Sequence, residues 1–291
     1  MTVCIGVIPR FTDKIILVSD QLLSSDEASV EGVMKWATVA PGTEWYVMFA
    51  GDPSRFPPLM DRVREVLGDV RNTRLTLASV TEAFETAYRL ELLKIIESEI
   101  LRPYGLTHAE FIRKGKRLLG EVRFNHVMDQ VVATDLAIEV LVAGLDAMGQ
   151  TQLFSVSARG VVTPAALPYH AIGAGAPIAL GTLYPLTHFP TPMPDLTETV
   201  YRVCAAKFAA ETAPSVGKST HAMVISPMAG TWTLLMEIDR LRELWLTKGQ
   251  PPVPPGALQM IRRDLKRLEF RPRSRRLEKS RTGYPARPDQ E

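Results

Sequence analysis

Thr2 is the residue of this chain that is best placed to do chemistry. It follows Met1 directly and begins a strand-like run over residues 2–8. Small second residues generally permit removal of the initiator methionine. Thr2 would then carry a hydroxyl nucleophile and a free α-amine, which can act as its own general base. Many proteins begin Met-Thr and use neither group, so the case for a site depends on the residues downstream.

Two charged residues lie at the right places further along the chain. A polar turn separates the first run from a second apolar one, Ile15–Val18, which leads into Asp20. A hairpin of this kind brings Asp20 back beside the start of the chain. Lys35 then interrupts an apolar alternation over residues 33–39, where a purely structural strand would not place an ammonium group. Because a buried ammonium needs a carboxylate partner, we expect Lys35 to pair with Asp20.

The order of these residues resembles the proteasome β-subunit family of N-terminal nucleophile hydrolases, in particular the bacterial proteasome-like proteins that begin Met-Thr. That family has an N-terminal Thr, an Asp that ends the second strand, a Lys on the next strand, and an Ala-Gly that closes the strand after it. The matching positions here are Thr2, Asp20, Lys35 and Ala50-Gly51. Residues 141–146, 152–156 with a turn at Gly160, and 171–183 resemble the family's central strands, Gly-rich turn and following helix, so that the resemblance spans about residues 2–236.

The resemblance implies a catalytic set of Thr2, Asp20, Lys35, Gly51 and Ser215. The Thr2 hydroxyl would attack a carbonyl carbon while the α-amine accepts its proton. Lys35 would stabilise the developing alkoxide, and Asp20 would orient Lys35. The backbone N–H of Gly51 would donate to the oxyanion of the tetrahedral intermediate. The expected reaction is acyl transfer through a threonyl ester, which water then hydrolyses. A peptide or protein substrate and a homo-oligomeric ring or related assembly are implied by the same resemblance, and no cofactor is.

The chain also departs from the family's pattern around the N-terminal amine. Active members carry a Ser in the Gly-rich turn, where this chain has Ala174. They also carry an Asp three residues before a second Ser. Here Ser215 is kept, but Thr212 takes the place of the Asp, unless Glu211 serves instead. A catalytically inactive, ring-forming scaffold of the same fold is therefore the alternative prediction. Substituting Ser for Ala174 is expected to raise activity if the missing polar support limits the amine.

The hydrophobic periodicity predicts an α+β fold. Strands dominate up to Ala50, and apolar residues then recur at helical spacing over residues 56–70 and 78–101, with a weak capping-box pattern at residues 79–82. Further helices are expected over residues 177–184 and 196–210, and two strands over residues 221–225 and 231–236. Hairpins flanked by helix pairs predict the four-layer α-β-β-α sandwich of the N-terminal nucleophile hydrolase fold, with two mainly antiparallel sheets. The hydrolase domain would cover residues 1–248.

Two segments lie outside this plan. Residues 102–123 are basic and longer than the usual family connection, which predicts a surface excursion with a solvated helix face. Residues 249–291 begin with a Pro-rich break, and beyond Ile261 they hold eleven Lys or Arg against five Asp or Glu. We expect a basic and partly disordered tail. Docking of this tail to nucleic acid or to an acidic partner is a second alternative function, which is less favoured than a solubilising role.

Composition excludes several other classes of protein. The chain has 291 residues, 46% hydrophobic residues and a net charge of +2, which suits one large globular domain. Two cysteines in apolar runs and five scattered histidines predict neither a disulfide framework nor a metal site. No run is long and apolar enough to cross a membrane, and no secretory signal pattern begins the chain, so a cytoplasmic protein is expected.

Overall fold

The core of the protein consists of two five-stranded antiparallel sheets that pack face to face. The structure, a computed structural model, describes residues 2–9, 12–24, 29–30, 32–68, 75–164, 167–185, 195–226, 230–233, 237–248, 253 and 255–269. The first sheet has the order β10-β1-β2-β11-β12, and its strands are β1 (Cys4–Val7), β2 (Ile15–Asp20), β10 (Tyr169–Ile172), β11 (Thr220–Ser226) and β12 (Gly230–Thr233). The second has the order β5-β6-β7-β8-β9, with β5 (Trp36–Thr38), β6 (Trp45–Gly51), β7 (Ile138–Leu145), β8 (Thr151–Ser157) and β9 (Gly160–Val162). A short hairpin joins β3 (Leu23–Ser24) to β4 (Ser29–Val30).

Both faces of each sheet are covered, which explains why the central strands read as nearly continuous apolar runs. All six residues of β2 are buried. Its side chains alternate between two apolar clusters: Ile15 and Leu17 pack between the sheets, and Ile16 and Val18 pack under the helices. Strands buried on both faces need apolar residues at every position, and not only at alternate ones.

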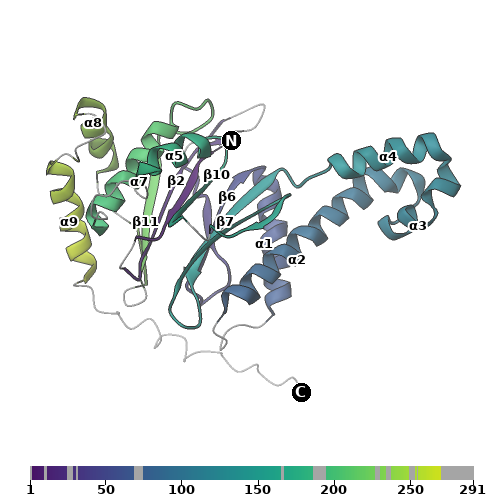
Figure 1. Cartoon of the computed structure of the whole chain (residues 1–291), viewed down its shortest axis with the longest axis horizontal. Coiled ribbons are helices and arrows are strands. Elements are labelled where there is room, and N and C mark those ends of the chain that lie inside the picture. The colour runs from purple at the N-terminus through teal and green to yellow at the C-terminus, as the bar shows by residue number, and fades with distance from the viewer. Residues whose placement is uncertain are drawn as a thin grey trace, which may run out of the picture.

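Two helix layers complete the sandwich (Figure 1). On one side, α1 (Phe56–Leu67) and α2 (Leu77–Ile95) cover the sheet that contains β6, β7 and β8. On the other, α5 (Ala176–Leu183) and α7 (Leu196–Ala210) cover the sheet that contains β1 and β2. The predicted four-layer α-β-β-α sandwich of two antiparallel sheets is therefore confirmed.

The second helix layer is extended by two helices that were not expected. α8 (Ile238–Lys248) and α9 (Pro255–Glu269) pack against α7 at one end of the molecule (Figure 1). Ala257 and Ile261, one helical turn apart on α9, are fully buried. The high content of Arg and Lys hid this narrow apolar stripe, so the ordered part of the chain continues into the segment that was expected to be a tail. Residues 270–291 lie outside the described residues, and the expectation of disorder there is not tested.

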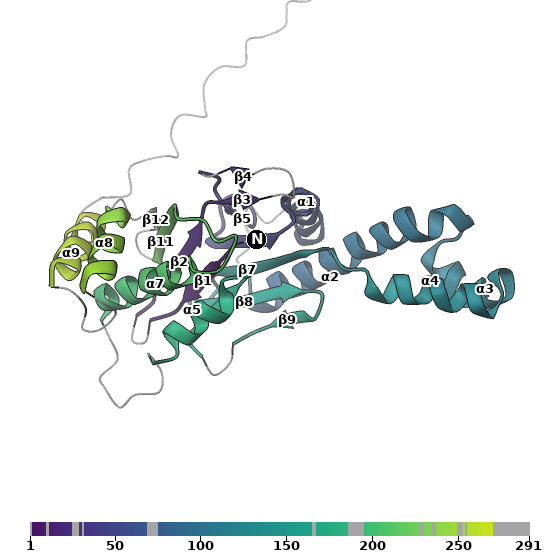
Figure 2. The same cartoon turned by 90° about the horizontal axis from the view of Figure 1, so that it is seen from above.

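The basic segment over residues 102–123 belongs to a helical arm that projects from the sandwich (Figure 2). α2 continues into a π-helical turn (Ile96–Leu101) and a 3₁₀ turn (Arg102–Tyr104), and the arm then folds back through α3 (His108–Leu119) and α4 (Glu121–Ala133). It has a small apolar core of its own, composed of Ile96, Leu101, Phe111, Val127 and Val131. The predicted surface excursion is thus a packed helical hairpin.

The helix starts also differ from the predicted one. Thr76 caps α2 and forms a capping box with Ser79. The observed box therefore begins three residues before the weak pattern that was expected at residues 79–82. Thr107 and Glu110 form a second capping box at the start of α3. Each box satisfies N–H groups at a helix start, and so defines where that helix begins.

One edge of the sandwich gathers the ends of several strands from both sheets. The register pairs Cys4 with Ser19 and Thr220 with Asp20, so the start of β1 lies beside the end of β2 and the start of β11. In the other sheet, Gly51 at the end of β6 pairs with Ile138 at the start of β7. Residues that are far apart in the sequence therefore meet at this edge.

Candidate active site

Thr2, Asp20 and Lys35 form one buried hydrogen-bonded cluster at the edge where β1 begins. The Oγ1 atom of Thr2 donates to Oδ1 of Asp20 and accepts from Nζ of Lys35. Nζ of Lys35 also lies 3.0 Å from Oδ2 and 3.1 Å from Oδ1 of Asp20. The exposed fractions are 2% for Thr2, 0% for Asp20 and 1% for Lys35. The ion pair that the sequence predicted between Lys35 and Asp20 is therefore confirmed.

The backbone holds the Asp20 carboxylate in place. Oδ1 accepts a hydrogen bond from the N–H of Val3 at 2.9 Å, and Oδ2 accepts from the N–H groups of Leu22 and Gly217, both at 3.1 Å. Together with Thr2 and Lys35, these donors use both oxygens. A buried carboxylate is tolerated only when its charge is paired and its oxygens are hydrogen-bonded in this way. Asp20 is thus a rigid acceptor around which the other two side chains are arranged.

Lys35 reaches the cluster because it lies immediately before β5. Its carbonyl accepts a hydrogen bond from the N–H of Phe49 at 3.2 Å, which aligns this segment with β6. The side chain is fully buried, and its Nζ atom meets Thr2 and Asp20. Within residues 33–39 only Lys35 and Val39 are fully buried, and Met34 is 61% exposed.

Gly51 ends β6 in a conformation that excludes larger residues. Its φ angle is +109°, and a Cβ atom built there would lie 2.2 Å from the carbonyl oxygen of Ala137. Successive N–H groups of a strand point in opposite directions. The N–H of Gly51 therefore points to the same side as that of Phe49, which is the side of Lys35. In this direction the Gly51 N–H could donate a hydrogen bond to the carbonyl oxygen of a substrate bound above Lys35.

The Gly-rich turn after β10 packs directly on the backbone of Thr2. The N–H of Gly175 donates to the Thr2 carbonyl at 3.3 Å, and a Cβ atom on Gly173 would lie 2.3 Å from that carbonyl oxygen. Ala174, between the two glycines, is exposed. Gly173 approaches the Thr2 backbone too closely to carry a side chain. The same turn places Ala174 near Thr2.

The structure does not join Ser215 to the cluster. Ser215 is half-buried with a φ of +91°, and its hydroxyl forms no hydrogen bond with any described residue. Thr212 is exposed and donates to the carbonyl of Ala209. Glu211 accepts from Lys207 and Arg242, so it does not replace the missing Asp. Met1 lies outside the described residues.

A second buried ionic network, which the sequence analysis missed, supports the first. Nζ of Lys207 is buried and donates to Glu211 at 2.6 Å, to the carbonyl of Gly217 at 2.7 Å and to that of Lys218 at 2.9 Å. Arg242 contacts both oxygens of Glu211 and also the carbonyl of Lys218. Burial lowers the pKa of Lys207, and the hydrogen bond from Lys207 to Glu211 opposes this effect.

This network fixes the loop whose Gly217 N–H binds Asp20. Lys207 lies among apolar residues near the end of α7, and Glu211 follows it by four residues at the C-cap, a spacing that indicates an ion pair. That signal was present in the sequence. The contacts to the loop and to Arg242 were not visible in it, because they join three separate elements.

Other kinds of chemistry find little support in the part of the chain that the structure describes. No group of three or more His, Cys, Asp or Glu residues there could hold a metal ion. Cys4 and Cys204 are buried free thiols, and burial raises the pKa of each, that of Cys204 to about 12. Such thiols are poor nucleophiles. None of the described helices combines the length and the apolar character that a membrane span requires.

Comparison with known proteins adds one structural likeness. No protein-family model and no curated protein matches the chain. A similar solved structure is the crystal structure of eukaryotic HslV from Trypanosoma brucei, with a TM-score of 0.48 and 16% sequence identity. The match covers 77% of this chain and 99% of that one. At this level the likeness carries no conclusion about activity or substrate.

Proposed function

We propose that this chain is a proteasome-like N-terminal threonine hydrolase, a peptidase or amide-bond hydrolase that acts after Met1 is removed. One observation carries the proposal. The hydroxyl of the second residue lies between a buried ammonium group, Lys35, and a buried carboxylate, Asp20, and it is hydrogen-bonded to both. Threonine hydroxyls need activation to attack a carbonyl carbon, and these two neighbours together with a free α-amine would provide it.

In the first half of the proposed reaction, Oγ1 of Thr2 attacks the carbonyl carbon of the substrate. The hydroxyl proton passes to the α-amine of Thr2, directly or through one water molecule. Negative charge then develops on the carbonyl oxygen, where the N–H of Gly51 would donate a hydrogen bond. The Lys35 ammonium stabilises the attacking oxygen as it loses its proton. The tetrahedral intermediate collapses to the threonyl ester, and the leaving amine takes the proton from the α-ammonium.

In the second half, water hydrolyses the ester. The α-amine removes a proton from the water, whose oxygen attacks the ester carbonyl, and the same Gly51 N–H would again receive the oxyanion. Collapse of this intermediate returns a proton to Oγ1 and releases a carboxylic acid. Asp20 does not react in either half. It holds Lys35 and the start of β1 in position through its hydrogen bonds.

We propose further that the substrate is a peptide or protein and that the chain self-associates in the cytoplasm, as the resemblance to proteasome β-subunits implies. Ser215 is kept in the proposal as a support for the α-amine, which forms only when Met1 is removed. Binding of nucleic acid or an acidic partner by the basic tail, residues 249–291, is the less favoured alternative.

A second candidate function is a catalytically inactive scaffold of the same fold. Two observations favour it: Ala174 and Thr212 lack the polar groups expected around the amine, and the hydroxyl of Ser215 is not bonded to the described residues of the cluster. An amine without oriented partners is a weaker base. Loss of such supporting residues typically lowers rates without abolishing them, so the hydrolase is the stronger proposal.

The test is intact-protein mass spectrometry with an electrophilic probe that selects N-terminal threonine. We expect loss of Met1 and a single adduct on Thr2, which is absent from Thr2→Ala. Thr247→Ala, which removes a hydroxyl that only caps carbonyls within α8, is the matched control and should be labelled like the wild type. Lys35→Met should abolish labelling without removing Thr2. Retention of Met1, or equal labelling of Thr2→Ala, would overturn the proposal and leave the scaffold function.

A further inference from the structure

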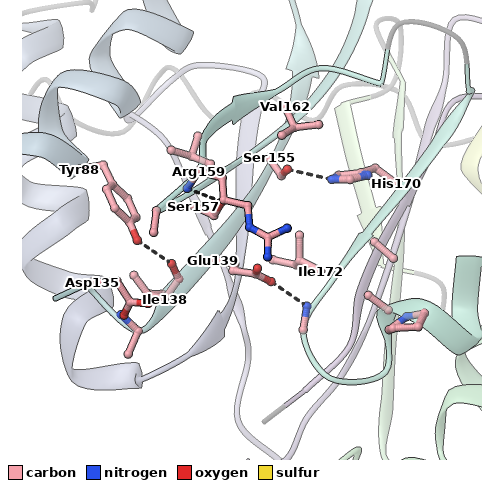
Figure 3. Close-up of a pocket in the computed structure, with 17 residues that line it drawn as sticks. Tyr88, Asp135, Ile138, Glu139, Ser155, Ser157, Arg159, Val162, His170 and Ile172 are labelled. Carbon is pink, nitrogen blue, oxygen red and sulfur yellow. Dashed lines mark hydrogen bonds between the residues drawn. The ribbon is translucent and has the colours of Figure 1, made fainter. Parts of the chain in front are cut away.

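A cavity of about 500 Å³ opens beside the candidate active site, between the ends of the two sheets (Figure 3). Its walls come from the start of β7, the end of β8, the end of β10 and the first turn of α5. The volume falls within the range of about 300–1,000 Å³ that is typical of small-molecule sites. The cavity is therefore large enough for a short peptide fragment.

The cavity shares two walls with the candidate active site. Gly173, which lines it, packs against the carbonyl of Thr2. Ala137 and Ile138, which line it as well, lie against Gly51, and the carbonyl of Ala137 accepts from the N–H of Asp52 at 2.8 Å. In the order of the sheet, Lys35 lies to one side of Gly51 and the cavity to the other. A substrate whose carbonyl group reaches the Gly51 N–H would thus have one end over Lys35 and the other over the cavity.

The cavity is polar at positions where a purely structural sandwich would be apolar. Glu139 shares the inter-sheet face of β7 with Leu141 and Ala143, and Ser155 shares that of β8 with Leu153. Strand alternation directs such residues to the side that faces the other sheet, where Ser155 is buried and Glu139 is exposed at the rim. His170 comes from the opposite sheet, and its Nε2 atom lies 2.8 Å from Oγ of Ser155. Burial lowers the pKa of His170, against the opposing effect of Glu139, and this favours the neutral imidazole as a hydrogen-bonding group.

Two opposite charges line the cavity without pairing. The guanidinium of Arg159 forms no ion pair or hydrogen bond with any residue that the structure describes, and Figure 3 shows its side chain extending into the cavity toward Glu139 and Ile172. One carboxylate oxygen of Glu139 accepts from the N–H of Gly173 at 3.1 Å. The other oxygen has no partner among the described residues. An unpaired cation and a half-used anion on one cavity suit a ligand that carries both charges.

We propose that this cavity binds the leaving-group side of the substrate, a short peptide fragment that ends in a free carboxylate. Arg159 would bind the carboxylate. Glu139 accepts a hydrogen bond from Gly173, which packs on the Thr2 carbonyl, and it would bind the ammonium group that forms when the expelled amine takes up a proton from solvent. The assignment to the leaving group rests on the proposed function, and it would make the enzyme selective for peptides cut near their C-terminus. Binding of a zwitterionic fragment does not itself depend on catalysis.

The experiment measures binding to full-length Thr2→Ala protein by titration calorimetry, so that no turnover can occur. Three probes are compared: the dipeptide Ala-Ala, its N-acetylated form and its C-terminal amide. Hydrogen bonds to charged groups contribute enough to change affinity about tenfold or more. We expect the free dipeptide to bind at least about tenfold more tightly than either blocked form. Arg117→Gln, on the arm and far from the cavity, is the control for Arg159→Gln.

Each variant should remove one preference only. Arg159→Gln should bind the free dipeptide and its amide equally, while keeping the preference over the N-acetyl form. Glu139→Gln should do the reverse, and Arg117→Gln should match the Thr2→Ala parent. Equal binding of all three probes, no saturable binding, or preferences that survive in both cavity variants would overturn the proposal. Because this result does not involve Thr2, a failure here is distinct from a failure of Thr2 to label.

Discussion

Replacing Asp20 with Asn tests whether the buried cluster is organised around a negative charge. The amide has one oxygen and one NH₂ group, whereas both oxygens of Asp20 accept hydrogen bonds. Oδ1 faces Thr2 and the N–H of Val3, and Oδ2 faces the N–H groups of Leu22 and Gly217. Whichever way the amide turns, its NH₂ group would meet at least two donors. Lys35 would at the same time lose its only carboxylate partner among the described residues.

The expected cost is set by burial. Removing one partner of a buried ion pair typically costs about 3–5 kcal/mol, because the other charge is left uncompensated. All three side chains of the cluster are at most 2% exposed, so solvent cannot replace the lost contacts. We therefore expect Asp20→Asn to lower the free energy of unfolding by about 4 kcal/mol, equivalent to roughly 10 °C in Tm for a chain of this size. Asp129→Asn, on an exposed face of α4, should change it by less than about 0.5 kcal/mol.

The assay is urea-induced unfolding followed by tryptophan fluorescence, with Lys35→Met and the double variant measured beside Asp20→Asn. Since Met carries no charge, the double variant removes both members of the pair and should be more stable than the sum of the single losses predicts, by about 2 kcal/mol. A loss below about 1 kcal/mol for Asp20→Asn, or strict additivity in the double variant, would show that Asp20 and Lys35 are not coupled as the geometry indicates.

Three further results are expected. Gly160→Ala should cost about 1 kcal/mol of stability, because the φ of Gly160 is +91° and a new methyl group there meets no other atom. Gly51→Ala should cost at least about 1 kcal/mol more, because its methyl group would meet the carbonyl of Ala137. Equal losses of stability in thermal unfolding would contradict this contact. Burial lowers the pKa of both His170 and His221, so the unfolded chain binds more protons near and below pH 6.5 and stability should fall as the pH decreases through that value toward the folded-state values. Replacing both with Gln should flatten this part of the pH profile, and an unchanged slope would exclude the two histidines as its cause. Ala174→Ser should raise kcat for peptide hydrolysis by about tenfold if the α-amine lacks polar support, and an unchanged rate at equal Thr2 labelling would remove that explanation.

The local signals of the chain determined much of the cluster. A hairpin between two apolar runs is a short-range structure, so its register could be expected from the sequence, and the register alone places Asp20 beside the start of β1. A Lys inside an apolar alternation requires a buried counter-charge, which pointed to Asp20. The strand end at Gly51 and the helix over residues 196–210 are also products of local pattern.

Tertiary structure decided the rest, because those features depend on groups that come from distant elements. The third N–H on Asp20 belongs to Gly217, nearly two hundred residues away, and Lys207 and Arg242 hold its loop in place. Ser215 lies two residues before Gly217, yet its hydroxyl forms no hydrogen bond with the described residues of the cluster. Its φ of +91° is likewise a property of the folded loop that no spacing in the sequence reveals.

The cavity and α9 illustrate the same limit. Glu139 and Arg159 occur in ordinary strand and turn positions, and only the packing of two sheets makes them face one space. The apolar stripe of α9 is narrow and surrounded by Arg and Lys, so its burial becomes evident only where α7 offers a surface to cover it. Hydrophobic periodicity indicates which side of a helix or strand is buried. The fold of the whole chain decides which other element packs against that side.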